Sequence, residues 1–159
     1  MRIRVHDDLR LEQVLYTGKD FVFIGLGGKA NRALSERRIK RSPLRDVANM
    51  LLSFRYAADS VFFDQVSGVT NRPEISAALE FWSGYWCDWV TATFLKGYFE
   101  GIGESSLLPR NDPDVRALLD IFVLERSLEE IGRELSERPD WARIPARMIL
   151  RLLEVSPVQ

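Results

Sequence analysis

The chain of 159 residues contains one cysteine and one histidine, and its 22 basic and 23 acidic side chains nearly cancel. A single cysteine excludes an internal disulfide framework, and one cysteine with one histidine leaves little for a zinc site. A net charge of −1 argues against a nucleic-acid binder, which is typically strongly basic. No apolar run approaches the roughly 20 residues of a transmembrane helix, and the N-terminus lacks the apolar segment of a signal peptide. We therefore expect a cytoplasmic protein with no nucleic-acid or membrane partner.

The length and composition indicate a single domain over residues 1–159. Hydrophobic residues make up 46% and charged residues 28% of the chain, which is the balance of an ordinary folded protein. Residues 1–30 differ from the rest because they hold short apolar runs and several glycines. Residues 14–16 and 21–24, joined by a turn that contains Gly18, predict a β-hairpin. Two strands alone are marginally stable, so the hairpin must lie on helices or pair with something outside this chain.

From Ser42 onward the apolar residues recur at three- and four-residue intervals, the period of an α-helix. Ser42-Pro43 is a typical helix start, because serine can accept hydrogen bonds from free backbone N–H groups and proline fits the first turn. The pattern predicts helices over residues 42–58, from 74, from 112 to a break at 138–140, and after 141. The expected fold class is therefore α+β and mainly α, with the N-terminal β-hairpin packed on a helical part at residues 42–155.

The residues that can carry chemistry lie beside the hairpin. A short apolar run at residues 2–5 leads into His6-Asp7-Asp8, and the carboxamide of Gln13 follows five residues after Asp8. This layout is typical of phosphotransferases. An aspartate there orients the acceptor hydroxyl and takes its proton, and a carboxamide oxygen can bind Mg²⁺. A second carboxylate, at the end of the next strand, normally holds Mg²⁺ on the phosphates.

Four stretches of the chain resemble a known family of kinases. Residues 6–13 read H-D-D-L-R-L-E-Q against the family's H-G-D-L-H-L-G-Q, and residues 24–30 read I-G-L-G-G-K-A against I-D-F-E-G-E-P. Residues 36–50 and 138–145 also match. The chain thus resembles the C-terminal part of maltokinases, which are aminoglycoside-phosphotransferase-like kinases often fused to trehalose synthase. Because the resemblance covers only the end of the family's domain, the ATP-gripping N-terminal lobe is expected to be absent.

The resemblance implies a C-terminal lobe of protein-kinase-like fold and ATP-dependent phosphorylation of maltose to maltose 1-phosphate, with ATP and Mg²⁺ as cofactors. Asp8 stands where the family has its catalytic base, and Gln13 stands at the carboxamide ligand of the metal. Asp46, by analogy with kinase folds, braces the catalytic loop through hydrogen bonds, and His6 is a structural residue of that loop.

The chain departs from the family where the phosphate centre should be. Gly25 replaces the metal-binding aspartate, and Gly27 replaces an acidic residue two positions later. Asp7 replaces a glycine and places a second carboxylate beside Asp8. Framework positions match while ligand positions differ, which is the pattern of a decayed kinase. We therefore expect this chain to be inactive as a kinase by itself.

A further departure from the family affects the positions expected to contact the sugar substrate. The family runs approximately L-E-K-A-x-Y-E-L-x-Y-E where residues 124–134 read L-E-R-S-L-E-E-I-G-R-E. Two aromatic positions that would contact sugar are Glu129 and Arg133 here, whereas Glu130 and Glu134 keep the family's acidic residues. The resemblance therefore implies Glu130 and Glu134 as substrate-binding candidates.

Simpler interpretations stay open for these loops. Asp8 can be an ordinary turn residue, because aspartate is common in turns, and Gln13 can cap the turn once its partner carboxylate is missing. Gly25-x-Gly27-x-x-Ala30 imitates a dinucleotide fingerprint, but no second strand leads to the acidic residue that such a site needs. The basic run at residues 37–41 is interpreted as a solvated loop.

The tryptophans of the second long helix allow two interpretations. Trp82, Trp86 and Trp89 could stack on sugars, but their helical spacing predicts core residues. Cys87 lies among them and is predicted to be a buried, inert thiol.

A domain that covers only part of a family's core would expose apolar surface, and such patches invite partners. The alternative function is therefore a non-catalytic interaction module. It would dock on trehalose synthase, on a separately encoded kinase N-terminal lobe, or on a second copy of itself.

Overall fold

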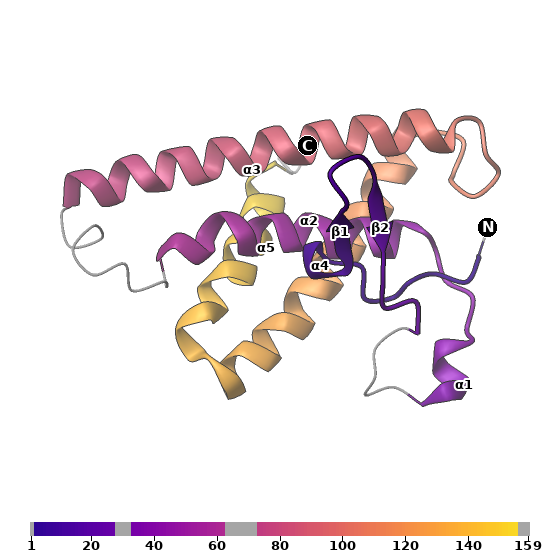
Figure 1. Ribbon diagram of the computed structural model, residues 1–159, viewed down its shortest axis with the longest axis horizontal. Coiled ribbons are helices and arrows are strands. Elements are labelled where there is room, and N and C mark those ends of the chain that lie inside the picture. The colour runs from indigo at the N-terminus through magenta and orange to yellow at the C-terminus, as the bar shows by residue number, and fades with distance from the viewer. Residues whose placement is uncertain (1, 28–32, 63–72, 156–159) are drawn as a thin grey trace.

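The computed structural model describes residues 2–27, 33–62 and 73–155, and its elements follow the expected order. They are the 3-10 helix η1 (Leu11–Gln13), β1 (Val14–Tyr16), β2 (Phe21–Phe23), α1 (Leu34–Arg37), α2 (Leu44–Asp59), η2 (Ser60–Phe62), α3 (Pro73–Ile102), α4 (Asp112–Glu137), η3 (Pro139–Ala142) and α5 (Arg143–Val155). The mainly helical fold with an N-terminal β-hairpin is confirmed (Figure 1). Residues 28–30, the end of the run matched at 24–30, lie outside the described residues.

The long helices begin where local side-chain chemistry predicts. At the start of α4, the Asn111 side chain accepts a hydrogen bond from the backbone N–H of Asp114 at 2.8 Å, and Pro113 occupies the first turn. At the start of α2, the Ser42 hydroxyl accepts a hydrogen bond from the backbone N–H of Leu44 at 3.3 Å. These contacts lie within a few residues of each other in the chain, which is why the sequence predicts the helix boundaries well.

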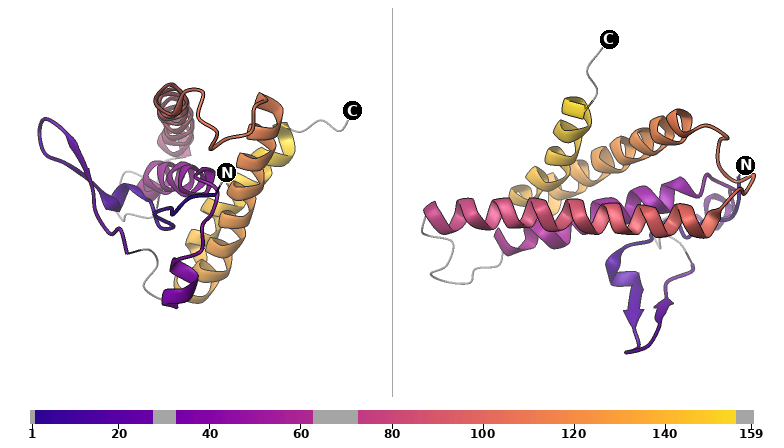
Figure 2. Two further views of the ribbon diagram at one scale, coloured as in Figure 1. Left: turned by 90° about the vertical axis from the view of Figure 1, so that its right-hand side faces the viewer. Right: turned by 90° about the horizontal axis from the view of Figure 1, so that it is seen from above.

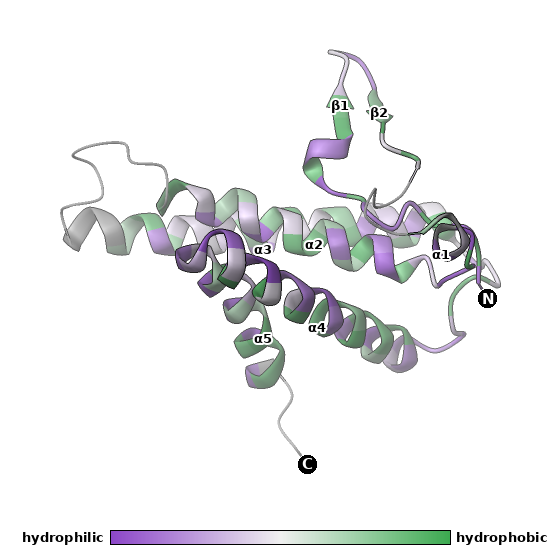
Figure 3. Cartoon of the chain, turned by 90° about the horizontal axis from the view of Figure 1, so that it is seen from below, coloured by the Kyte–Doolittle hydropathy of each residue, from purple (hydrophilic) through white to green (hydrophobic). Residues whose placement is uncertain are grey.

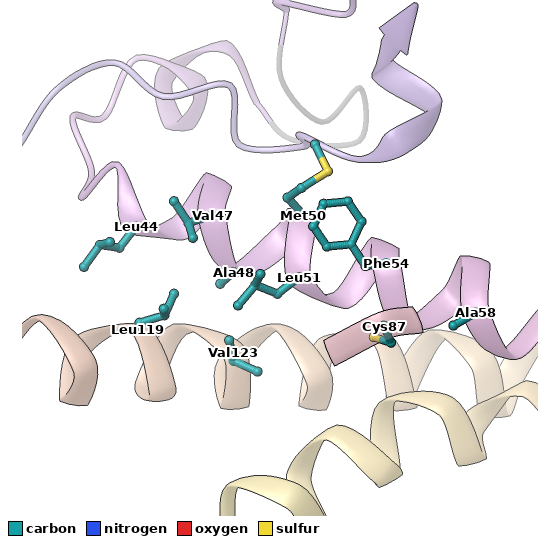
Figure 4. Close-up of a cluster of buried hydrophobic side chains, with 10 residues drawn as sticks. All are labelled: Leu44, Val47, Ala48, Met50, Leu51, Phe54, Ala58, Cys87, Leu119 and Val123. Carbon is teal, nitrogen blue, oxygen red and sulfur yellow. The ribbon is translucent and has the colours of Figure 1, made fainter. Parts of the chain in front are cut away.

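Helix α2 is the centre of the core and contacts α3, α4 and α5. Side chains of α2 pack against α4, and Phe54 meets Phe94 of α3 edge-on with the ring centroids 5.4 Å apart. The buried cluster comprises Leu44, Val47, Ala48, Met50, Leu51, Phe54, Ala58, Cys87, Leu119 and Val123 (Figure 4). The expected helical part at residues 42–155 therefore shares one hydrophobic core built around α2.

A buried polar link joins α2 to α3. The Arg55 guanidinium pairs with the Asp59 carboxylate at 2.7 Å, and Asp59 also accepts a hydrogen bond from the Ser83 hydroxyl at 2.9 Å. All three residues are less than one-tenth exposed. Because buried charges must be paired to be tolerated, this link favours the observed placement of α3 on α2.

The β-hairpin attaches to the helices through its base only. Strands β1 and β2 pair antiparallel, and Val14 at the base packs against the helical core. Further out, Tyr16 is 66% exposed and Phe21 is 65% exposed, and β2 is exposed along its whole length. The hairpin projects from the helices (Figure 2), and its strands are coloured as hydrophobic over most of their length (Figure 3). The hairpin was expected either to lie on the helices or to pair with something outside this chain. In the structure its contact with the helices is limited to its base.

The apolar run at residues 2–5 is not part of the two-stranded sheet. It makes one isolated antiparallel bridge, in which Ile3 and Arg41 exchange backbone hydrogen bonds of 2.9 and 2.8 Å. The bridge holds the N-terminal segment beside the start of α2. Within residues 2–27, 33–62 and 73–155, no helix has the length and apolarity needed to cross a membrane.

The prediction that the three tryptophans of α3 are core residues is wrong. Trp82, Trp86 and Trp89 are 61%, 44% and 66% exposed. The reason is that α3 faces α2 with its opposite side, where Ser83 and Cys87 are buried. Burial raises the pKa of the Cys87 thiol, so the predicted inert character of this cysteine agrees with its position.

Candidate functional site

The loop at residues 6–8 is held against the first turn of α2. The Asp46 carboxylate accepts hydrogen bonds from the backbone N–H groups of His6 at 2.7 Å and Asp7 at 2.8 Å, one on each oxygen. Burial raises the pKa of Asp46, and the two backbone hydrogen bonds oppose that rise. These are the contacts that a brace for this loop requires, and they join residues about forty positions apart in the chain.

The imidazole of His6 joins the same loop to the segment that follows β2. Its Nε2 lies 2.6 Å from the carbonyl oxygen of Ile24, and the backbone N–H of Ile24 donates to the carbonyl of Gln13 at 2.9 Å. Three segments therefore meet here: the loop at residues 6–8, the end of η1, and the residues just after β2. This is the place where the sequence predicts the phosphate centre.

Gly25 lies directly against the side chain of Gln13. A Cβ atom built on Gly25 would lie 2.2 Å from Oε1 of Gln13, so the amide occupies the space that a larger residue would need. Gly25 has a φ of +73°, a conformation that favours glycine. The structure thus places side by side the two positions expected to carry the metal ligands.

The residues present at this point do not fit a Mg²⁺ ion. Mg²⁺ takes near-octahedral oxygen ligands and is usually held through one or two carboxylates. Gln13 offers one neutral amide oxygen, and Gly25 offers no side chain. Within the part of the chain that the structure describes, no group of three or more acidic, histidine or cysteine side chains is arranged to hold a metal.

Asp8, the candidate catalytic base, contacts a cation of its own loop. Its carboxylate lies 3.3 Å from the Arg10 guanidinium, which also reaches Glu12 at 3.5 Å. Asp8 is therefore paired with Arg10 rather than with Gln13. The side chain of Asp8 is 19% exposed, so one side of it remains open to solvent.

Asp7 adopts a backbone conformation that favours glycine, the residue at this position of the maltokinase pattern that residues 6–13 resemble. Its φ is +62°, and among the described residues it is the one non-glycine residue with a positive φ. Aspartate tolerates this left-handed region better than most residues. The Asp7 carboxylate faces Arg45 at 3.8 Å and Arg41 at 3.9 Å, so two cations accompany the added charge.

A small polar cavity lies between this loop and α4. Its volume is about 10 Å³, which is the room that roughly one water molecule needs. Arg45 borders the cavity, lies over the ring of Phe122 at 5.5 Å and pairs with Glu125 at 2.6 Å. Sequence reasoning did not single out Arg45, although it stands next to Asp46 in the matched run at residues 36–50. In this conformation the cavity has no room for a sugar.

The two candidate substrate-binding glutamates lie inside the protein. Glu134 is fully buried; its carboxylate accepts hydrogen bonds from Arg138 at 2.8 and 3.0 Å and from the hydroxyl of Tyr56 at 2.9 Å. Glu130 is 3% exposed and pairs with Arg126 and Arg133. A sugar could reach either carboxylate only by displacing these partners. The geometry therefore favours a structural role over the expected contact with substrate.

Comparison with known proteins identifies the fold. No family model matches the chain. Two solved structures of glucosamine kinase, crystal forms B and A, match with TM-scores of 0.76 and 0.70 at 18% and 19% identity. A third, in complex with glucosamine, ADP and inorganic phosphate, matches with a TM-score of 0.74 at 18% identity. The matches cover 97–98% of this chain and 33–36% of the others, so the chain spans about a third of their length. The chain thus has a sugar-kinase-like fold over nearly its whole length, and the similarity does not single out maltokinases.

Proposed function

We propose that this chain is a sugar-kinase-like C-terminal lobe whose phosphate centre has decayed, so that it does not transfer phosphate by itself. The observation that carries the proposal is the contact between Gly25 and Gln13. The scaffold of the centre persists, because Asp46 and His6 hold three segments together, but the carboxylate that should face the amide is missing. A centre without that carboxylate cannot hold Mg²⁺ against the negative charge of the phosphates.

Two independent resemblances support a sugar as the substrate class of the ancestral enzyme. Residues 6–13 and 24–27 resemble maltokinases, whose reaction transfers the terminal phosphate of ATP to maltose, and the similar solved structures are glucosamine kinases. In an intact ancestor, Asp8 would orient the sugar hydroxyl and accept its proton, and Gln13 would supply an oxygen to the metal. In this chain the Asp8 carboxylate instead pairs with Arg10, which stands where the family has a histidine.

The substitution Gly25→Asp tests the proposal. The Gln13 amide occupies the position of the new Cβ and must turn aside. The new carboxylate would then lie next to the amide oxygen, and Mg²⁺ binding is expected to appear in titrations followed by the amide NMR signals of residues 13 and 25. Gly18→Asp is the matched control, because Gly18 also has a positive φ but lies at the hairpin turn with open space around it. The unmodified chain and the control are expected to show no Mg²⁺-dependent shift at these positions.

Two results would contradict the proposal. One is phosphate transfer from ATP to maltose or glucosamine by the unmodified chain. The other is binding of Mg²⁺ or MgATP by the unmodified chain as tightly as by Gly25→Asp, since the missing carboxylate would then not explain the lost function.

The alternative is a non-catalytic module that docks through its β-hairpin. The exposed apolar side chains of both strands favour this alternative, because an isolated two-stranded hairpin is marginally stable without a covering surface. The partners to test are trehalose synthase and a separately encoded kinase N-terminal lobe. A complex in size-exclusion chromatography that Phe21→Asp abolishes and Leu128→Asp on α4 leaves intact would support docking, and the absence of any complex would contradict it.

A further inference from the structure

The outward side of α3 carries a continuous aromatic surface. We call Phe81, Trp82, Tyr85, Trp86 and Trp89 the α3 aromatic face; each is between 44% and 66% exposed. The rings of Phe81, Trp82, Tyr85 and Trp89 form a chain of contacts, with centroid separations of 5.5 to 6.4 Å. Helix α3 lies along the outside of the molecule (Figures 1 and 2), and these five side chains are exposed within the part of the chain that the structure describes.

The size of this face lies at the upper end of ordinary surface patches and approaches that of one side of an interface. A large aromatic side chain presents 150–250 Å², so five of them at the exposures found here offer roughly 500–700 Å² of apolar area. The largest apolar patch of a typical monomer is about 300–600 Å², and each partner of a stable interface buries about 800 Å². A helix that is apolar on both sides is normally buried on both sides, whereas α3 is covered by α2 on one side only.

The spacing on α3 identifies what could cover it. Exposed residues recur with a seven-residue period in two rows: Trp82, Trp89 and Lys96 form one, and Ala78, Tyr85 and Ala92 form the other. Such paired rows are the seam of a two-helix coiled coil. Along the seam Trp82 and Ala92 lie five residues before and after residue 87, so an antiparallel copy of the same helix that is centred there sets the large Trp82 against the small Ala92.

We propose that the α3 aromatic face is a homodimer interface in which two copies of α3 pack antiparallel about a twofold axis near residue 87. In this register Trp82 packs against Ala92 of the second copy, and Tyr85 packs against Trp89 of the second copy. Lys96 covers Ala78 of the second copy with its aliphatic stem while its ammonium group stays in water. Each contact occurs twice, because the twofold axis repeats it.

The acidic side chains on α3 near the aromatic face are already paired within the chain, so they do not oppose burial of the face in a dimer. Glu80 pairs with Arg147 of α5 at 2.5 Å, and Asp88 pairs with Arg151 of α5. An ion that enters an interface without a partner costs several kcal/mol. Asp88, the acidic residue that flanks the seam, already has a partner within its own chain, so the dimer would bury no unpaired charge from it; Glu80 lies seven residues before Cys87, on the same side of α3 as that cysteine.

The first test measures mass. Sedimentation or light scattering of the unmodified chain at tens of micromolar is expected to give twice the mass of one chain. Tyr85→Glu places two charges near the twofold axis and is expected to give a folded monomer with unchanged helical circular dichroism. Leu128→Glu is the matched control, because Leu128 is a similarly exposed apolar residue on α4, 56% exposed, and this variant is expected to remain a dimer.

The second test fixes the register. Trp82→Cys combined with Ala92→Cys is expected to form a disulfide-linked dimer on mild oxidation, because residues 82 and 92 of the two copies face each other. Trp82→Cys alone is expected to stay unlinked, since ten residues along a helix separate the two introduced cysteines by about 15 Å, beyond the reach of a disulfide. The native Cys87 is buried on the other side of α3 and should not interfere.

Four results would overturn the inference, and the first three concern the dimer itself. They are a monomeric unmodified chain at these concentrations, a dimer that persists in Tyr85→Glu, and linkage of Trp82→Cys alone as efficient as that of the double variant. Binding of a maltodextrin to the aromatic face of a monomeric chain would also overturn it, since sugar stacking would then account for the exposed rings. None of these results depends on whether the phosphate centre binds Mg²⁺.

Discussion

Replacement of Glu134 by alanine is expected to lower the free energy of unfolding by about 3–5 kcal/mol, the cost of leaving buried charges without their partner. Glu134 is fully buried where α2, α4 and η3 meet, and its carboxylate accepts hydrogen bonds from Arg138 and Tyr56. Arg138 also lies over the ring of Trp141, with its guanidinium carbon 4.4 Å from the ring centroid. Loss of the carboxylate therefore leaves two polar groups and one stacking contact without their common anchor.

Urea denaturation of the unmodified chain and of Glu134→Ala measures this loss of stability. Glu137→Ala is the matched control, because Glu137 is an exposed glutamate at the end of the same helix, and its removal is expected to change stability by less than about 0.5 kcal/mol. If Glu134 served the substrate instead, Glu134→Ala would keep its stability and lose only sugar affinity. A change in unfolding free energy no larger than that of the control would contradict the structural role.

The lowered pKa of Glu134 predicts that its contribution to stability depends on pH. Burial alone would raise the pKa of Glu134, but hydrogen bonds from Arg138, Tyr56 and Arg133 outweigh it and hold the pKa below its usual value. A carboxyl group whose folded-state pKa is lowered stabilises the protein fully above the usual glutamate pKa of about 4.3, and that stability is lost as the pH falls through the lower folded value. The difference between the unmodified chain and Glu134→Ala should therefore be constant near neutral pH and shrink in acid.

Replacement of Asp46 by alanine is expected to release the loop at residues 6–8 and to lower stability by about 2–3 kcal/mol. The estimate follows because two backbone N–H groups lose a charged acceptor at once, and hydrogen bonds to charged groups are worth about 1.5–3 kcal/mol each. Part of that loss is recovered when the freed loop is hydrated. Since His6 also contacts Ile24, the segment after β2 should loosen together with the loop.

Amide hydrogen exchange at His6, Asp7 and Ile24 measures the release directly. Asp114→Ala is the matched control, because Asp114 is the third residue of α4 as Asp46 is of α2, and it carries the same charge near a helix N-terminus. The control should lose only the helix-dipole contribution of about 0.3–1 kcal/mol together with its local contact to Asn111. Unchanged exchange at His6 and Asp7 in Asp46→Ala would show that the carboxylate does not hold the loop.

Helix-start and helix-break residues, together with the glycine-containing turn, predicted the helices and strands of this chain well. The helix starts at Ser42-Pro43 and Asp112-Pro113, the break at residues 138–140 and the hairpin around Gly18 all correspond to observed boundaries. Each depends on contacts between residues a few positions apart, such as the capping of α4 by Asn111. The resemblance at residues 6–13 likewise led to the kinase-like fold that the similar solved structures support.

Contacts between distant segments decided the rest. Helical spacing alone describes Trp82 and Cys87 in the same way, yet one is exposed and the other buried, because only the packing of α2 selects which side of α3 is covered. The acidic run at residues 129–134 reads as a possible sugar site, yet Glu134 is enclosed by Tyr56 and Arg138 from other elements. What the sequence determined by itself was where helices and strands begin and end, since those depend on neighbouring residues. Which faces are covered and which charges are paired was decided only by the tertiary structure, since burial and pairing depend on residues tens of positions away.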